Sequence, residues 1–260
     1  MTESPPNLPG ALDFTGRVIL VTGGAAGVGR GISERFLAAG GVVAVCGRHE
    51  PETVPASGGR SATFHKADVR DADQVGALID EVMARHGRLD VAVNNAGGSP
   101  PADSATASPK FSTAIVALNL LAPLFVAQRA YAVMEDGGSI INIGSVSGQR
   151  PTPTTAAYGA AKAGLVNLTQ TLAMEWAPKV RVNMITVGVI KTEKSHLFYG
   201  DDAGLAAVAA TVPFGRMALP ADVGDACLLL SSPLARYITG ANLEVHGGGE
   251  RPPYLGASTA

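Results

Sequence analysis

The chain is poor in the residues that mark metal sites and disulfide-rich folds. Two of its 260 residues are cysteines, Cys46 and Cys227. Both fall in apolar stretches, where free cysteine behaves as a small buried hydrophobe. Neither belongs to a metal-ligand spacing, so the sequence predicts no metal site. Two isolated thiols are also consistent with a reducing cytoplasm.

Strong charge and long apolar runs are lacking as well. The formal net charge of -2 offers no electrostatic attraction for nucleic acid or an anionic membrane. No uninterrupted apolar run approaches the ~18 residues of a membrane span. Residues 1–16 carry acidic residues and prolines where a signal peptide would carry basic residues followed by an apolar run. We therefore expect a soluble cytoplasmic protein with small-molecule partners, which binds neither nucleic acid nor membrane.

What the chain does have is a regular alternation of apolar segments. Hydrophobic residues make up 46% of it, enough for one large core. Short β-branched runs predict strands at 17–22, 42–46, 62–66, 89–93, 139–143, 181–186 and 242–245. Helical spacing predicts helices at 27–39, 71–86, 108–134, 156–176 and 220–231. This order predicts a single α/β domain with a doubly wound parallel sheet between two helical layers.

The predicted domain has segments outside this alternation. We assign 17–248 to a catalytic, dinucleotide-binding domain, 1–16 to an N-terminal extension and 249–260 to a tail. The connection 49–60 contains prolines and glycines that leave little room for a helix. Segments 99–107 and 191–217 are expected to be irregular. Segment 191–217 is expected to act as a lid over a largely apolar substrate pocket.

A glycine-rich turn follows the first predicted strand. Gly23, Gly27 and Gly29 stand where a backbone must bend and approach a pyrophosphate, with Val28 between the last two. The free N–H groups of the next helix would face those phosphates. The spacing differs from G-x-G-x-x-G, having three residues between Gly23 and Gly27. A turn with a purely structural role remains an alternative.

Tyr158 and Lys162 are four residues apart in the predicted helix 156–176. Residues at this spacing are neighbours on a helix surface. A free tyrosine ionises near pH ~10, and a nearby cation favours the phenolate. The pair is therefore a candidate proton donor with an adjacent charge. An ordinary helix with one aromatic and one basic residue is the alternative.

Together with Asn94-Asn95-Ala96-Gly97, Asn119 and Ser145, these motifs resemble those of the short-chain dehydrogenase/reductase family, including its 3-oxoacyl carrier-protein reductases. The resemblance spans residues 16–248 and implies a Rossmann-type fold. It implies that Tyr158 is the general acid or base and that Lys162 lowers the pKa of Tyr158 and binds the nicotinamide ribose. It further implies that Ser145 binds the reacting oxygen. Asn119 would hold a water that links Lys162 to solvent, although an asparagine satisfied by the backbone remains the alternative.

The resemblance also implies where the cofactor binds. After the second strand, where an NAD-binding chain would place a carboxylate, the sequence has Gly47 and Arg48, so we favour NADP(H) over NAD(H). An arginine that is only a solvated surface charge is the alternative. Arg30 is a candidate second phosphate contact. Asp68 is expected to bind the adenine amino group, with helix capping as the alternative. The remaining predicted contacts are the loop glycines with Val28, and Val69, Asn95, Ala96, Gly97, Gly188, Ile190 and Thr192.

Two departures from the family pattern concern the later strands. Val187 replaces the usual proline before Gly188, which should loosen the loop that follows. His246 stands where aspartate is common, and we expect it to serve packing or assembly. Arg150 is a candidate contact for an anionic substrate group, with a solvent-facing arginine as the alternative.

The predicted function is the interconversion of a ketone and a secondary alcohol with NADP(H), with Tyr158 as general acid or base. One alternative is a non-catalytic NADP(H)-binding sensor or scaffold, which would need no general acid. Another is a sugar-nucleotide epimerase or dehydratase, which shares the tyrosine–lysine pair but resembles longer chains. The family usually forms tetramers, and helices 108–134 and 156–176 carry more apolar residues than one face can bury, so we expect a homotetramer.

Overall fold

The computed structural model describes residues 10–252, and its centre is one parallel sheet. Its seven strands follow the order β5-β2-β1-β6-β7-β8-β9. The strands are β1 (Val18–Thr22), β2 (Val42–Gly47), β5 (Thr63–Lys66), β6 (Val91–Asn94), β7 (Gly138–Ser145), β8 (Val180–Val187) and β9 (Asn242–Val245). Each neighbouring pair is parallel. The order reverses between β1 and β6, so the doubly wound, Rossmann-type fold is confirmed.

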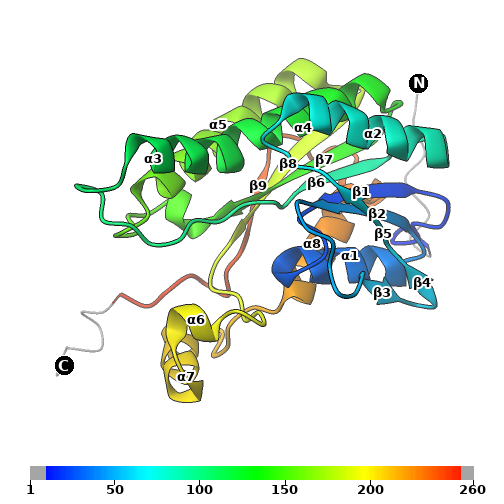
Figure 1. Cartoon of the computed structure of the whole chain (residues 1–260). Coiled ribbons are helices and arrows are strands. Elements are labelled where there is room, and N and C mark those ends of the chain that lie inside the picture. The colour runs from blue at the N-terminus through cyan, green and yellow to red at the C-terminus, as the bar shows by residue number, and fades with distance from the viewer. Residues whose placement is uncertain (1–9, 253–260) are drawn as a thin grey trace.

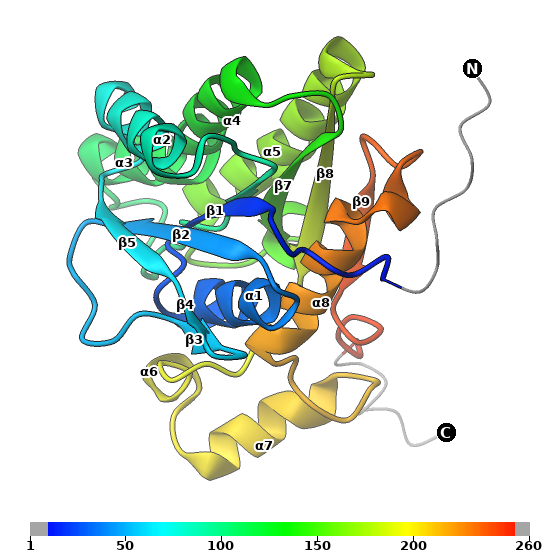
Figure 2. The same ribbon diagram turned by 90° about the vertical axis from the view of Figure 1, so that its right-hand side faces the viewer.

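Helices cover both faces of this sheet (Figures 1 and 2). One layer contains α2 (Ala72–His86), α3 (Pro109–Val116), α4 (Ala122–Val133) and α5 (Ala156–Trp176). The opposite layer contains α1 (Gly27–Ala38) and α8 (Pro220–Ser231), which pack against each other. Two short 3-10 turns, η2 (Val146–Gly148) and η3 (Pro233–Ala235), follow β7 and α8.

The sequence of β1 shows how the two layers arise. All five of its residues are buried, as expected for a central strand that is covered on both faces. Val18 and Leu20 belong to the core beneath α2 and α4. Ile19 and Val21 belong to the core beneath α1 and α8. The two-residue side-chain period of a strand thus divides one apolar run between two cores.

Residues 49–60 form no helix, as predicted, but a small hairpin begins within them and ends at Ser61. Strands β3 (Ala56–Ser57) and β4 (Arg60–Ser61) pair antiparallel. Gly58 and Gly59 connect them with φ of +58° and +74°. Two consecutive positive φ angles are typical of tight hairpin turns, and glycine adopts them without a steric cost. The hairpin lies beside α1 (Figure 1).

The prediction of one continuous α-helix over 108–134 was wrong in its middle. A π-helical turn, η1 (Ala117–Leu121), separates α3 from α4. Ser108 caps the start, its Oγ accepting from the N–H of Phe111 at 3.1 Å. The whole stretch Pro109–Val133 is long and apolar enough for a membrane span by length and composition. Core helices pass the same test, and Val126 and Ala130 of this stretch lie in the core.

Segment 191–217 was expected to be irregular, and this was partly wrong. It contains α6 (His196–Tyr199) and α7 (Asp202–Thr211). Both stand away from the sheet, below α1 and α8 in the two views (Figures 1 and 2). Leu197, Phe198 and Phe214 of this segment are exposed large apolar residues.

The predicted extension and tail lie partly outside the described residues, which exclude 1–9 and 253–260. Within the described part, Phe14 is 2% exposed and belongs to the core beneath α1. Its ring meets that of Phe36 edge-on, with 5.1 Å between the centroids.

Candidate active site

The four predicted catalytic residues come from three elements at the carboxyl end of the sheet. Ser145 is the last residue of β7, and Asn119 lies in η1. Tyr158 and Lys162 are in the first two turns of α5. Because α5 packs on β7 and η1, these separated segments meet at one site.

Tyr158 lies beside Ser145. Burial raises the pKa of the Tyr158 phenol, and a hydrogen bond with Ser145 opposes that rise. The sequence suggested that Lys162 would lower this pKa, whereas here the opposing group is Ser145. A raised pKa keeps the phenol protonated at neutral pH, which is the state that a proton donor requires.

Lys162 is 4% exposed, an unusual position for an ammonium group. Burial lowers its pKa to about 8. Its Nζ donates to the carbonyl oxygen of Ile143 at 2.8 Å and lies 5.7 Å from the centroid of the Tyr158 ring. Lys162 is therefore held beside the phenol by a buried hydrogen bond.

Asn119 is fully buried and bonded to backbone groups. Its Nδ2 donates to the oxygens of Ile115 and Gly98 at 2.9 and 3.0 Å, and its Oδ1 accepts from the N–H of Gly98 at 2.9 Å. These contacts match the alternative of an asparagine satisfied by the backbone. Its predicted link to Lys162 rests on proximity: a Cβ at Gly97 would lie 2.7 Å from Asn119 Oδ1 and 3.4 Å from Lys162 Nζ.

The glycine-rich turn has the shape that a dinucleotide phosphate requires. Gly23 and Gly27 have φ of +62° and +52°. A Cβ at Gly29 would lie 2.3 Å from the oxygen of Gly23, so a side chain there is excluded. Val28 follows in the first turn of α1, whose free N–H groups face the turn. The backbone at this point can therefore approach a pyrophosphate closely.

Asn95 ties this turn to the end of β6. Its Nδ2 donates to the oxygens of Thr22 and Gly23 at 2.9 and 3.3 Å. The Oγ1 of Thr22 accepts from the N–H groups of Asn95 and Ala96 at 3.0 and 2.9 Å. Asn95 and Ala96 thus hold the glycine-rich turn in place, whatever else they contact.

A cleft of 490 Å³ runs from this turn toward α3. It brings together most of the predicted adenosine-side contacts, namely Gly23, Arg48, Asp68, Val69, Ala96 and Gly97. The sequence did not predict its other lining residues, which include Arg70, Phe111, Ala114, Ile115, Leu118 and Lys194. A cleft lined by glycines of the turn and by the cations Arg48, Arg70 and Lys194 fits an adenine dinucleotide.

Asp68 is paired within this cleft. Arg70 holds it in a two-point ion pair, with Nε 2.9 Å from Oδ1. The hydrogen bond from Arg70 lowers the pKa of the Asp68 carboxyl, with a smaller contribution from the charge of Arg48. The capping alternative for Asp68 was wrong, because Asp71 caps α2 by accepting from the N–H groups of Asp73 and Gln74.

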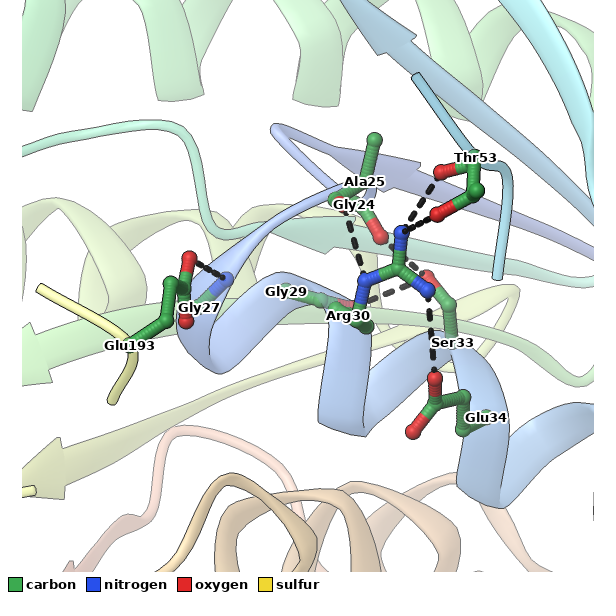
Figure 3. A network of polar contacts seen from close by, with 9 residues as sticks. All are labelled: Gly24, Ala25, Gly27, Gly29, Arg30, Ser33, Glu34, Thr53 and Glu193. Atoms are coloured by element: carbon green, nitrogen blue, oxygen red, sulfur yellow. Dashed lines mark hydrogen bonds and ion pairs between the residues drawn. The ribbon is translucent and has the colours of Figure 1, made fainter. Parts of the chain in front are cut away.

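Arg30, suggested as a second phosphate contact, is not among the residues that line this cleft, and its guanidinium is bonded elsewhere. Its Nε donates to the oxygen of Ala25 at 3.1 Å, and its NH2 group donates to the oxygen of Thr53 at 2.5 Å (Figure 3). A weaker contact joins it to Glu34 at 3.4 Å. Arg30 thus binds the loop after β2 to the start of α1.

The segment after β8 is held by backbone contacts to β9 and to Ala218. Val187 extends β8 in register with Ser145 and Val245, and the N–H of Gly188 donates to Val245 at 3.2 Å. Ile190 forms a bridge with Ala218. The valine in place of proline therefore continues the sheet. Thr192 lies near the turn, its Cγ2 3.8 Å from where a Cβ of Gly27 would be.

A second cavity, of 370 Å³, lies at the ends of β7 and β8. It is lined by Val146, Gln149, Arg150, Gly188, Val189, His246, Gly249, Glu250, Arg251 and Pro252. Arg150 forms an ion pair with Glu250 across it. Glu244 accepts from Gln149 Nε2 and contacts His246 Nε2, both at 2.8 Å. His246 thus belongs to a chain of polar contacts beside Gly188.

Comparison with known proteins places the chain in a family. The family model described as enoyl-(acyl carrier protein) reductase matches residues 23–250. The L-fucose dehydrogenase of Oryctolagus cuniculus is 35% identical over 252 residues, which cover 91% of this chain and 86% of that protein. An uncharacterised short-chain type dehydrogenase/reductase of Sinorhizobium fredii is 36% identical over 239 residues, or 90% of this chain and 43% of that longer protein.

A solved structure agrees. The aldohexose dehydrogenase of Thermoplasma acidophilum is 30% identical and superposes with a TM-score of 0.83, covering 90% of this chain and 94% of that one. The chain belongs to the short-chain dehydrogenase/reductase family of oxidoreductases, which bind NAD(P)(H) and act on alcohol and carbonyl groups.

Proposed function

We propose that this enzyme interconverts a ketone and a secondary alcohol with NADP(H), and that Tyr158 is its general acid and base. The half-buried phenol of Tyr158 beside Ser145, with Lys162 Nζ 5.7 Å from the centroid of its ring, carries the proposal. A molecule that only binds a dinucleotide would need no protonated phenol at this position. The rival sensor or scaffold function is therefore less well supported.

Each of the four residues has a role in moving one proton. The cofactor, when bound, would supply or accept the hydride at the carbonyl carbon. Tyr158 donates its phenolic proton to the carbonyl oxygen during reduction and takes it back during oxidation. Ser145 binds the same oxygen and stabilises the negative charge that develops there. Lys162 stabilises the resulting phenolate and binds the cofactor ribose, and Asn119 supports the path by which the proton is replaced.

The charges of the cofactor cleft support NADP(H) over NAD(H). Gly47 offers no carboxylate to a ribose hydroxyl, and Arg48 is exposed beside it. Asp68, the carboxylate that lines the cleft, is already paired with Arg70. A 2'-phosphate would therefore meet Arg48 without a competing negative charge. Asp68 and Val69 would lie along the adenine, and Gly188, Ile190 and Thr192 along the nicotinamide.

Two observations bear on the substrate, and they favour different classes of compound. The exposed Leu197, Phe198 and Phe214 of the lid, 191–217, favour an apolar ketone. The cavity beside Gly188 contains Gln149, Arg150 and His246, which favour a hydroxylated or anionic compound. Relatives include an L-fucose dehydrogenase and a 3beta-hydroxysteroid dehydrogenase, so the family covers both classes. We propose the apolar ketone and take the hydroxylated compound as the second candidate.

The test is turnover of a carbonyl panel by the purified protein with NADPH and with NADH. The panel contains apolar ketones, steroid ketones, acyl thioester ketones and hydroxylated ketones. Reduction that consumes cofactor in proportion to product supports the oxidoreductase. A changed product without net cofactor consumption would support the epimerase or dehydratase. Binding of NADPH with no turnover of any member would support the sensor.

We further propose a soluble cytoplasmic homotetramer. Leu121 and Met174 are exposed at 41% and 85% on the helical layer where the family's long helices associate. Light scattering at micromolar concentration would measure the mass directly. A monomer there would refute the tetramer and leave the chemistry untouched.

A further inference from the structure

The lid inserts a carboxylate at the start of α1. Glu193 Oε1 accepts a hydrogen bond from the backbone N–H of Gly27 at 3.0 Å (Figure 3). The two residues are 166 positions apart, so the contact is a tertiary one. Gly27 is the first residue of α1 and the third glycine of the phosphate-binding turn. Glu193 therefore binds where a dinucleotide would place its pyrophosphate.

The contact follows from the electrostatics of the helix start. The first N–H groups of α1 have no partner within the helix, and the helix dipole places partial positive charge there. The described first turn of α1 contains no acidic residue, and Ala26 provides no side-chain cap. Glu193 supplies the negative group that the helix itself lacks. A phosphate would compete with Glu193 for the same donors.

Local bonds hold the lid so that Glu193 can reach α1. Ser195 is 3% exposed, and its Oγ accepts from the N–H of Thr192 at 2.8 Å and donates to the oxygen of Ile190 at 3.2 Å. The base of the segment is fixed where the N–H of Lys191 donates to Ala218 at 2.8 Å. The tight turn 192–195 thus presents Glu193 toward Gly27.

The next residue enters the same space. Lys194 lines the cofactor cleft together with Arg48 and Asp68, although its chain position is in the lid. Thr192, Glu193 and Lys194 therefore all face the region from the phosphate-binding turn to the adenosine end.

We propose that Glu193 is an internal substitute for the cofactor phosphate, which the cofactor must displace. In the free enzyme its carboxylate keeps the lid on the phosphate-binding turn. When the dinucleotide binds, the pyrophosphate takes the N–H of Gly27, and like-charge repulsion moves Glu193 away. Cofactor affinity is thereby reduced by the energy of the internal contact, and lid position is coupled to cofactor binding. This inference rests on the proposed cofactor site.

The first test measures the dissociation constants of NADPH and NADH for wild type, Glu193→Ala and Glu193→Gln by titration calorimetry. Glu193 is exposed and Gly27 is half-buried, so solvent screens the contact between them. A carboxylate at an exposed helix start is worth a roughly two- to fivefold change in an equilibrium constant. We expect Glu193→Ala to bind the cofactor roughly two- to fivefold more tightly, with Glu193→Gln between it and wild type.

A matched control removes the same charge elsewhere. Glu175 is exposed near the end of α5, 17 residues beyond Tyr158 and so roughly 25 Å along the helix. Glu175→Gln should leave cofactor affinity at the wild-type value. If it tightened binding as much as Glu193→Gln, the effect would be one of net charge, and the proposal would be wrong.

A second test needs no cofactor. Trypsin can cleave after Lys191 and Lys194, on either side of Glu193. Release of the turn from Gly27 should raise the open population, so the lid of Glu193→Ala should be cleaved roughly two- to fivefold faster than that of wild type. Mass spectrometry of the early fragments would locate the cuts.

The outcomes separate this inference from the function on which it rests. Wild type that binds neither dinucleotide would overturn the proposed cofactor site and this inference together. Wild type that binds, with Glu193→Ala equal or weaker in affinity, would overturn the internal substitute alone. Unchanged cleavage of the lid in Glu193→Ala would contradict it as well, since the contact would then not hold the turn.

Discussion

Charged groups differ in burial between two regions at the same edge of the sheet. One is the proposed catalytic end, around Lys162, and the other is the proposed adenosine end, around Arg48 and Asp68. At the catalytic end, Lys162 is 4% exposed and bonded to a backbone oxygen. At the adenosine end, Arg48 is exposed, and Asp68 and Arg70 pair at the mouth of a cleft. A buried polar group must keep its partner, because an unpaired one is costly, whereas an exposed one exchanges partners with water and ligands.

This difference assigns the two ends different tasks. The buried groups have one arrangement, which suits chemistry that depends on fixed geometry. In the exposed ion pair and in the contact of Glu193 with Gly27, a charged group of a ligand can take the place of one partner. Substitutions at the catalytic end should therefore have large, substrate-independent effects, and those at the adenosine end smaller effects that depend on the cofactor.

The largest effect is expected from Tyr158→Phe, which removes the transferable proton and keeps the ring. Turnover should fall ~10²- to 10⁴-fold, because general acid catalysis contributes that much. Cofactor affinity should stay near that of wild type. Steady-state rates with titration of NADPH would measure both, and a variant with more than about a tenth of wild-type kcat would remove Tyr158 from its role.

Lys162→Met should weaken catalysis and cofactor binding but stabilise the free protein. The pKa of Lys162 falls from 10.5 to about 8 on burial. At about 1.4 kcal/mol per pKa unit, the buried charge costs on the order of 3 kcal/mol of folding stability at neutral pH.

The sign of this cost fixes its pH dependence. Above pH 8 the folded lysine loses its proton before the unfolded one, so wild-type stability rises with pH up to about 10.5. The advantage of Lys162→Met should therefore be complete below pH 8 and shrink as pH approaches 10.5. Urea unfolding across this range would measure it. A constant difference between the two proteins would show that Lys162 is not buried as a charge.

The exposed end should give a smaller, cofactor-specific effect. Arg48→Ala should weaken NADPH binding about tenfold and leave NADH almost unchanged, since a charge-assisted contact to the 2'-phosphate is lost. Gly47→Asp should shift preference further toward NADH. Its Cβ would lie 3.5 Å from Phe64, an ordinary contact, so the fold should accept it. Equal weakening of both cofactors by Arg48→Ala would contradict the NADP(H) assignment.

The smallest effect is expected from Asp71, which lies near the proposed adenosine end and caps the start of α2. Its carboxylate accepts from the N–H groups of Asp73 and Gln74 at 3.0 and 3.2 Å. Asp71→Ala should reduce the free energy of unfolding by about 1 kcal/mol through loss of the cap. Chemical denaturation would measure this, and a matching loss of cofactor affinity would mean that Asp71 acts on the cleft.

The sequence predicted the parts that depend on local pattern. The positions of the strands follow from apolar runs and glycine turns, and the pairing of Tyr158 with Lys162 on one helix follows from helical spacing and the resemblance to a known family. The capping role of Asp71 was also local, but Asp68 was considered for it because both precede the same helix. The structure separates them, since the carboxylate of Asp68 is held by Arg70.

The parts that could not be predicted depend on contacts between distant segments. The hairpin β3–β4 has two-residue strands, too short to show a period, and lies against α1. The π-helical turn places Asn119 against the backbone of Gly98, which an α-helical reading of an apolar stretch could not reveal. The position of Glu193 on Gly27 depends on the whole path from β8 to the lid.

One measurement tests the central claim most directly. Wild type would be incubated with a ketone that it turns over and with NADPH carrying deuterium at both hydrogen positions of nicotinamide C4, and the product analysed by mass spectrometry. The account predicts a secondary alcohol with deuterium on its carbinol carbon, formed in proportion to the NADPH consumed. A product that carries no deuterium at that carbon, or that forms without consumption of NADPH, would contradict it.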